Sequence, residues 1–259
     1  MLEGLYAGAL EDAAARELEL SSSKIEQLAL DKPPALDALA ALARGPRVKI
    51  LAEVKRASPS RGDLAEIRDP AELAEIYASN GASAISVLTE MRRFKGSLED
   101  LKAVRASVSV PLLRKDFIAT EYQILEARAF GADIVLLIVA GLEQKVMKRL
   151  KVFIEQLGMT AFIETHDRYE LERALELDGR LVGVNARDLS TFETDRNLFG
   201  ELVQYFPEDV IRVAESAVRS ADDVAHYRSA GADVVLVGEA LVTNDPAAML
   251  KSFLSAPVS

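Results

Sequence analysis

Short runs of apolar residues recur along the chain, and stretches with the apolar and polar spacing of helices lie between them. Eight such runs are rich in Val, Ile and Leu, and they start roughly 20 to 35 residues apart, the length of one strand–helix unit. The predicted strands cover residues 48–55, 84–89, 110–115, 134–139, 160–164, 181–185, 210–215 and 234–238. Residues 70–77 and 121–130 have the periodicity of helices, and the second begins with acidic residues, as the helix dipole favours.

Three predicted helices end in nearly identical turns, each with a glycine before the next strand. Gly81, Gly131 and Gly231 can supply the left-handed residue that ends a helix. Apolar strands that alternate with helices indicate a parallel sheet covered by helices. Eight units favour a closed (β/α)8 barrel, the TIM barrel, over an open doubly wound sheet. No Gly-x-Gly-x-x-Gly follows the first strand, which further disfavours a dinucleotide-binding sheet.

The 259 residues fit a single (β/α)8 barrel domain over 1–259. Residues 1–45 are rich in Ala and Leu, and we expect them to form extra N-terminal helices packed on the barrel rather than a separate domain.

Composition excludes several classes of function. The net charge of −10 argues against binding to nucleic acid, which needs a basic face. The absence of cysteine excludes thiolate chemistry and a Cys-based zinc site, and two histidines are too few for a His-rich metal site, so no metal is expected. No apolar run approaches 18 residues and no signal peptide precedes the first helix, so we expect a cytoplasmic protein away from the membrane.

Charged side chains collect where the predicted strands end, although the strand bodies are nearly pure Val, Ile and Leu. Glu53 and Lys55 alternate along the first strand and therefore point the same way. Lys115, Glu164 and Glu215 end later strands. Polar residues can simply cap strands, but mixed cations and carboxylates at the active-site end of a barrel suit acid–base chemistry on an anionic substrate. Ser216 and Gly238 follow the last two strands, where such barrels often bind phosphate.

Several ordered motifs run along the chain: Glu53-Val-Lys-Arg-Ala-Ser-Pro-Ser-x-Gly62, Ser86-Val-Leu-Thr-Glu90, Phe94-x-Gly-Ser97, Leu113-Arg-Lys-Asp-Phe117, Gly183-Val-Asn-Ala-Arg-Asp-Leu189 and Ala214-Glu-Ser216. With these motifs the sequence resembles the indole-3-glycerol-phosphate synthase family of tryptophan biosynthesis over about residues 1–250. The resemblance implies a carboxy-lyase with no cofactor. The implied reaction closes the ring of 1-(2-carboxyphenylamino)-1-deoxyribulose 5-phosphate, with loss of carbon dioxide and water, to give indole-3-glycerol phosphate.

The resemblance also assigns roles to individual residues. Lys115 corresponds to the general acid, and Glu164 to the group that stabilises positive charge and acts in dehydration. Glu53 assists proton transfer, Lys55 binds phosphate or acts as a second acid, and Asn185 holds a substrate hydroxyl. The residues implied to bind the rest of the substrate are Arg187 for the anthranilate carboxylate, Ser58 in the first loop, and Phe94, Phe117, Leu136, Ile138 and Leu189 around the ring. Those implied to bind phosphate, besides Lys55, are Ser216, Ala217, Gly238 and Glu239.

Two positions depart from the family pattern, which often has Gly at Ala217 and Ser at Glu239. The Glu239 carboxylate is therefore expected to point away from the phosphate. His166 lies two residues after Glu164, and we expect it to open the following helix with Asp167 and take no part in the site.

Two other functions stay open at this point. One is a different phosphate-binding barrel enzyme such as phosphoribosylanthranilate isomerase, although that reaction typically employs a cysteine and this chain has none. The other is a non-catalytic phosphate-binding barrel. The expected partner is a small phosphorylated substrate, and the chain is expected to be a monomer or a weak homo-oligomer.

Overall fold

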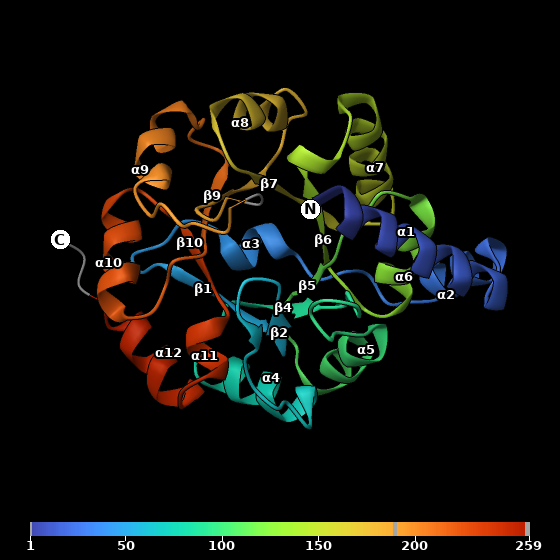
Figure 1. Cartoon of the computed structure of the whole chain (residues 1–259), viewed down its shortest axis with the longest axis horizontal. Helices are drawn as coiled ribbons and strands as arrows, with labels where there is room; N and C mark the ends of the chain where they lie inside the picture. Colours follow the sequence, from blue (N-terminus) through green and yellow to red (C-terminus); the bar gives the residue numbers. More distant parts are fainter. Residues whose placement is uncertain (1, 189–190, 257–259) are drawn as a thin grey trace.

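Eight parallel strands close into a barrel in the computed structural model, which describes residues 2–188 and 191–256 (Figure 1). The strands are β1 (Lys49–Val54), β4 (Ala84–Leu88), β5 (Leu112–Lys115), β6 (Ile134–Ile138), β7 (Thr160–Thr165), β8 (Leu181–Asn185), β9 (Ile211–Glu215) and β10 (Val234–Val237). They pair in chain order, and β10 pairs with β1 to close the ring. The apolar pattern predicted each strand, and only β7 extends past its predicted end, by one residue. The predicted TIM barrel is confirmed.

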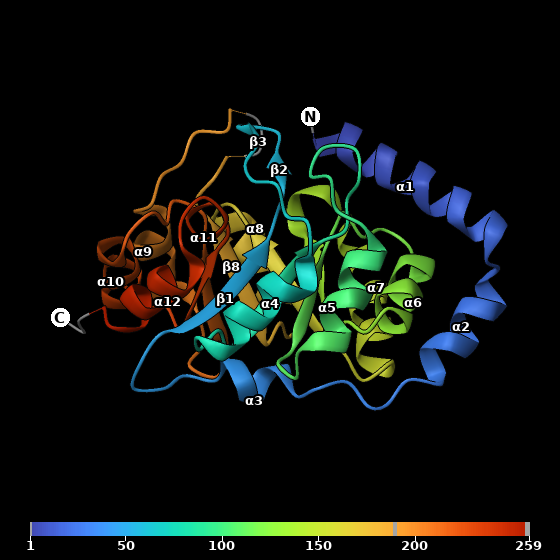
Figure 2. The same cartoon turned by 90° about the horizontal axis from the view of Figure 1, so that it is seen from below.

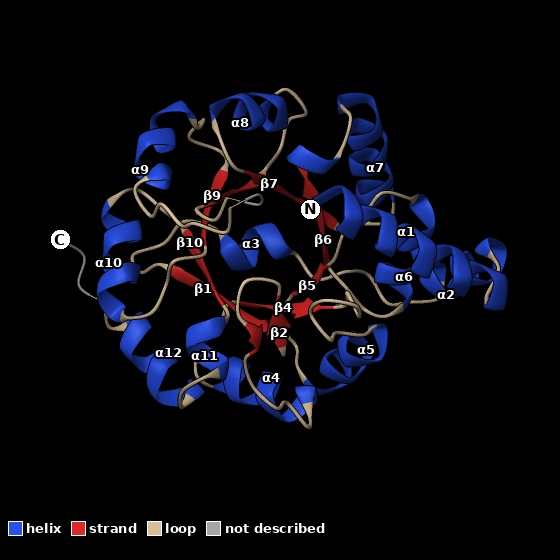
Figure 3. Ribbon diagram, in the orientation of Figure 1, coloured by secondary structure: helices blue, strands red, loops and turns tan. Residues whose placement is uncertain are grey.

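Helices surround the strands as an outer ring (Figure 3). They are α4 (Pro70–Ser79), α5 (Leu98–Ser107), α6 (Glu121–Ala129), α7 (Gln144–Gln156), α8 (Arg168–Leu175), α9 (Leu198–Leu202), α10 (Ala221–Ser229), α11 (Glu239–Val242) and α12 (Pro246–Leu254), with 3-10 turns η1 (Val139–Gly141) and η2 (Val203–Tyr205). Gly81, Gly131 and Gly231 have φ angles of 94°, 97° and 103°, as their predicted role requires. None of the helices in the described ranges is long and apolar enough to span a membrane.

The N-terminal segment forms the predicted extra helices, α1 (Leu2–Glu19), α2 (Ser22–Leu30) and α3 (Ala38–Leu42). Figure 2 shows α1 near one end of the barrel, α2 at its side and α3 across the opposite end. A separate apolar cluster joins α1 and α2 to α6. Asp133 accepts the N–H of Leu36 at 2.7 Å, and Arg44 pairs with Asp233 at 2.8 Å. These contacts fasten the segment to the amino ends of the strands.

The loop after β1 folds into a short hairpin of β2 (Ala57–Ser58) and β3 (Gly62–Asp63) above the carboxyl ends of the strands (Figure 2). Asp63 pairs with Lys95 at 2.6 Å. The segment with the Ser-Pro-Ser sequence therefore lies over the barrel mouth, where the side chains of the other loops can reach it.

Candidate active site

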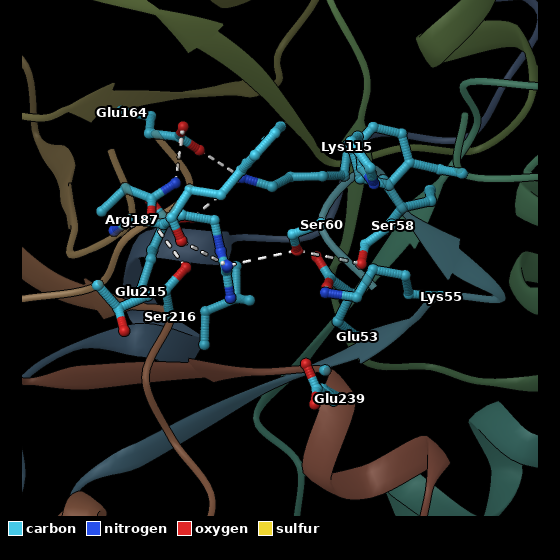
Figure 4. A pocket seen from close by; sticks show the side chains of 18 of the residues that line it. Glu53, Lys55, Ser58, Ser60, Lys115, Glu164, Arg187, Glu215, Ser216 and Glu239 are labelled. Atoms are coloured by element: carbon cyan, nitrogen blue, oxygen red, sulfur yellow. Dashed lines mark hydrogen bonds and ion pairs between the residues drawn. The ribbon is translucent and has the colours of Figure 1, made fainter. Parts of the chain in front are cut away.

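A cavity of about 440 Å³ opens at the carboxyl ends of the strands. Its lining includes side chains from β1, β5, β6, β7, β8, β9 and β10, together with the β2–β3 hairpin and the start of α1. Figure 4 shows charged side chains from opposite sides of the barrel pointing into this space. Every predicted site residue that the structure describes lines the cavity. Leu189 lies outside the described residues.

Lys115 on β5 lies between two carboxylates from distant strands (Figure 4). Its Nζ is 2.9 Å from Oε2 of Glu215 on β9 and also contacts Oε2 of Glu164 on β7. Both carboxylates are buried. The neighbouring Asp116 instead accepts hydrogen bonds from Thr89 and Arg114. The ammonium group of Lys115 therefore points into the cavity, and Asp116, the next residue in the sequence, does not neutralise it.

The two carboxylates have different electrostatic surroundings. Burial alone would raise the pKa of Glu164, but Lys115 and His166 lower it well below its usual range. Burial and the nearby charge of Glu164 raise the pKa of Glu215 to about 8, although Lys115 opposes this. Burial lowers the pKa of Lys115, but the charges of Glu164, Glu215 and Glu53 raise it above its ordinary value. At neutral pH this group of three residues therefore holds a charged Lys115, a charged Glu164 and a Glu215 that keeps its proton.

A second ion pair lies on β1 and just beyond it. Lys55 Nζ is 2.7 Å from Oε2 of Glu53, which confirms that the two side chains share a face. Ser86 on β4 donates to Oε1 of Glu53 at 3.4 Å. A Cβ on Gly238 would lie 2.4 Å from Oε2 of Glu53 and 3.1 Å from Lys55 Nζ. Gly238 thus leaves room for this pair in its present position, since a Cβ there would displace the ends of both side chains, a reason that the sequence pattern did not reveal.

Asn185 at the end of β8 connects the two halves of the site. Its Nδ2 donates to Oε1 of Glu164 at 3.1 Å, and its Oδ1 accepts from Ser216 Oγ at 2.8 Å. The same oxygen accepts the backbone N–H of Arg187 at 3.1 Å. The guanidinium of Arg187 donates to Ser60 Oγ at 3.3 Å, so it reaches the β2–β3 hairpin across the cavity. Asn185 thus fixes the positions of a carboxylate, a hydroxyl and an arginine.

An apolar wall covers the side of the cavity near β5 and β6. Phe94 packs on Phe117 with ring centroids 6.2 Å apart, and Leu136 and Ile138 lie on β6. The loop carboxylate of Glu90 accepts the N–H groups of Arg92, Arg93 and Phe94 and so holds Phe94 in place. Leu2 and Leu5 of α1 also line the cavity.

The ends of β9 and β10 carry the residues predicted to bind phosphate. Ser216 and Ala217 have φ angles of 69° and 56°, in the left-handed region that favours glycine. This geometry gives a physical reason for the glycine that the family often has at Ala217. The Glu239 carboxylate pairs with Arg61 of the hairpin at 2.6 Å. Its expected orientation relative to a bound phosphate stays a prediction.

Several lining or contacting residues were missed by the sequence analysis. Glu215 was noted at a strand end but given no role, although it contacts Lys115. Ser60 and Arg61 of the hairpin, Phe192, and Arg219 after β9 also line the cavity. His166, expected to take no part in the site, does not line the cavity, but its Nε2 lies 3.3 Å from Oε1 of Glu164. The period of two along a strand, which links residues 164 and 166, was the available signal.

Positive charge gathers at the mouth of the cavity. Burial lowers the pKa of the Arg187 guanidinium, and the positive charges of Arg61 and Arg219 lower it further, whereas Glu239 opposes them. Three guanidinium groups that affect one another in this way suit an anionic ligand. Over residues 2–188 and 191–256, no cluster of three His, Asp or Glu side chains has the arrangement of a metal site.

Comparisons with known proteins give the same family over nearly the whole chain. A family model described as "Indole-3-glycerol phosphate synthase" matches residues 2–253. The chain is 64% identical over 253 residues to a protein of that name from Leifsonia xyli subsp. xyli, with 98% of this chain and 97% of the relative covered. It is 54% identical to the protein of that name from Mycolicibacterium smegmatis, with 99% and 94% covered.

Two solved structures resemble the fold at low sequence identity. The N-acetylmannosamine-6-phosphate 2-epimerase of Clostridium perfringens aligns with a TM-score of 0.63 at 15% identity, covering 82% of this chain and 93% of that chain. The thiamine phosphate pyrophosphorylase of Pyrococcus furiosus aligns with a TM-score of 0.61 at 14% identity, covering 80% and 93%. At these identities the likeness concerns the barrel alone.

Proposed function

The chain belongs to the indole-3-glycerol phosphate synthase family, and from this premise we propose how its cavity carries out the reaction. The enzyme is a carboxy-lyase of tryptophan biosynthesis. It closes the ring of 1-(2-carboxyphenylamino)-1-deoxyribulose 5-phosphate and releases carbon dioxide and water. The reaction needs an acid for the ketone, cations for two anionic groups and an apolar surface for the aryl ring.

Lys115 is the proposed general acid, and its position between Glu164 and Glu215 is the observation that carries the proposal. As the ring carbon attacks the ketone carbon, an N–H proton of Lys115 moves to the ketone oxygen and leaves a neutral amine. Glu164, which remains ionised, stabilises the positive charge that develops on the ring system. It is also the acid or base partner in the later loss of water. Glu53 assists proton transfer, and Asn185 holds a substrate hydroxyl.

The remaining residues orient the substrate. Arg187 binds the anthranilate carboxylate, because its planar guanidinium matches the two carboxylate oxygens. The ring lies against the apolar wall of Phe94, Phe117, Leu136 and Ile138, and Ser58 adds a polar contact from the hairpin. The phosphate lies near Lys55, Ser216 and the backbone amides of Ala217, Gly238 and Glu239. Leu189 stays a predicted part of this wall.

We further propose that residues 1–259 work as one domain. Contacts that join residues 2–44 to α6 and to the amino ends of the strands, and the packing of Tyr6 on Phe117 at the carboxyl ends, support this proposal. A monomer or weak homo-oligomer in the cytoplasm remains our expectation, and light scattering after gel filtration would test the oligomeric state.

Fluorescence of the indole product tests the function directly. Purified protein is mixed with the carboxyphenylamino-deoxyribulose phosphate, beside Lys115→Ala and the control Lys151→Ala, whose lysine pairs with Glu155 on α7 away from the cavity. We expect product from the wild type and the control, and almost none from Lys115→Ala. Activity that survives in Lys115→Ala would move the acid role to Lys55. No product from folded wild type would contradict the proposed function.

A further inference from the structure

His166 lies directly after β7 with a carboxylate near each ring nitrogen. Its Nε2 is 3.3 Å from Oε1 of Glu164, and its Nδ1 is 3.0 Å from Oε2 of Glu170 on α8. The side chain of His166 is only 12% exposed. It does not line the cavity, so it contacts the site through Glu164 alone.

The start of α8 fixes the orientation of this ring. Asp167 caps the helix and accepts the N–H of Glu170 at 2.8 Å. Glu170 turns back, and its Oε2 accepts the backbone N–H of His166 at 2.8 Å as well as contacting the ring. One carboxylate oxygen thus holds both the main chain and the side chain of His166. The ring cannot turn away from Glu164 without breaking this arrangement.

Two flanking carboxylates favour the doubly protonated ring. Both nitrogens then carry hydrogen, because Nδ1 hydrogen-bonds to Glu170 and Nε2 lies within ion-pair distance of Glu164, although Nε2 has no hydrogen-bond partner among the described residues. Burial lowers the pKa of His166, but Glu164 and Glu170 raise it to about 10. The ring therefore adds a positive charge next to Glu164 that is separate from the charge of Lys115.

We propose that His166 is a positioning residue for the reaction, whose imidazolium, held by Glu170, fixes Oε1 of Glu164 and keeps that carboxylate ionised. The inference rests on the proposed role of Glu164. When Lys115 passes its proton to the ketone oxygen, it becomes neutral and no longer compensates the charge of Glu164. A carboxylate buried without a nearby cation would tend to take up a proton. His166 supplies the cation that remains through this step.

The other groups around the pair do not replace His166. Those facing Glu164 are Lys115 from β5, Asn185 from β8, the protonated Glu215 from β9 and the buried hydroxyl of Tyr6 from α1, with Glu53 acting on Lys115 from β1. Lys115 carries the only other positive charge in this set, and it is the one lost during the reaction. Glu164 and Glu170 are the charged groups that face His166.

Kinetics against pH test the proposal with three variants. His166→Gln keeps a donor for Glu164 but removes the charge, and Glu170→Gln removes the charge that holds Nδ1. Glu172→Gln on the same helix, whose carboxylate is 53% exposed and pairs with Arg168, is the control. We expect the acidic limb of the kcat profile to move to higher pH by about 1 to 3 units in His166→Gln, since a nearby opposite charge lowers a carboxyl pKa by that amount. Glu170→Gln should move it in the same direction by less, with KM little changed.

Nitrogen NMR of the ring gives a readout that does not depend on activity. The chain has two histidines, so His226→Gln leaves His166 as the only source of ring signals. At pH 8 both ring nitrogens should be protonated in this variant. Adding Glu170→Gln should lower the pH at which the ring loses its second proton, because Glu170 raises the pKa of His166. A neutral ring at pH 8, or an acidic limb that stays at the wild-type pH in His166→Gln, would overturn the proposal. A wild type that makes no indole product, with an imidazolium still present, would instead mark the failure of the proposed function.

Discussion

Replacing Glu215 by glutamine tests whether this buried carboxyl holds a proton near neutral pH. Burial and the charge of Glu164 raise its pKa from 4.5 to about 8 in the folded protein. Because the folded pKa lies above the unfolded one, the stability of the wild type relative to a neutral side chain is greatest below pH 4.5. It falls as the pH rises, and above pH 8 it changes no further. Glutamine has the shape of the neutral carboxyl and does not titrate.

The size of the effect follows from the two pKa values. Glu215 is buried, so solvent screening removes little of the energy. At pH 9 the wild type should be less stable than Glu215→Gln by on the order of 5 kcal/mol, and at pH 6 by about 2 kcal/mol. For a chain of this length, the gap in Tm between variant and wild type should therefore widen by on the order of 10 °C from pH 6 to pH 9.

Scanning calorimetry at one heating rate across this pH range measures the gap. Glu99→Gln, at a carboxylate that is 70% exposed, serves as the control and should show a gap that does not change with pH. If attraction to Lys115 outweighed burial, Glu215 would be ionised at pH 6, and the variant would be less stable than the wild type by a constant amount. That result would refute the reasoning.

Three further substitutions have separate expected outcomes. Gly238→Ala places a Cβ 2.4 Å from Oε2 of Glu53, so the ends of flexible side chains must move aside. The value of kcat should therefore fall about 100-fold while Tm changes little. Gly4→Ala, whose new Cβ would have no atom within 4 Å, is the control. Ala217→Gly relieves a left-handed φ of 56° and should raise the unfolding free energy by about 0.5–1 kcal/mol, measured in urea. Arg187→Lys loses the two-pronged contact with the anthranilate carboxylate, so KM should rise about tenfold in steady-state assays while kcat changes less.

The architecture was predictable because local and global signals agree. Buried parallel strands are continuously apolar, as β6 is. Three helices end in a glycine with positive φ, Gly131 among them, which turns the chain back toward the sheet. The strand–helix pattern therefore repeats along the sequence. Site residues were predictable for a related reason. A barrel brings the carboxyl ends of all its strands to one rim. A charged residue at a strand end, such as Lys115, can therefore be assigned to the site before its contacts are known.

The partners themselves were not predictable. Lys115 and Glu215 are 100 residues apart, and nothing in the apolar pattern says that Glu215 rather than Asp116 contacts the lysine. The contact between Lys115 and Glu215 depends on the closure of the barrel and on where β5 and β9 end along the barrel axis. The role of Gly238 was hidden for the same reason, because the atoms that a Cβ there would displace belong to Glu53 and Lys55, far away in the sequence.

The different protonation of Glu164 and Glu215 follows from contacts that no strand pattern contains, namely a hydrogen bond from Asn185 and an ion pair with His166. Each carboxylate contacts Lys115, so this lysine alone cannot distinguish them. Oε1 of Glu164 has Asn185 and the His166 ring beside it, whereas Oε1 of Glu215 is buried with no hydrogen-bond partner among the described residues. Charge therefore stays on Glu164 and the proton on Glu215. An ammonium has three N–H groups, and two face these carboxyls, so the third is left to meet the ketone oxygen of a substrate in the cavity.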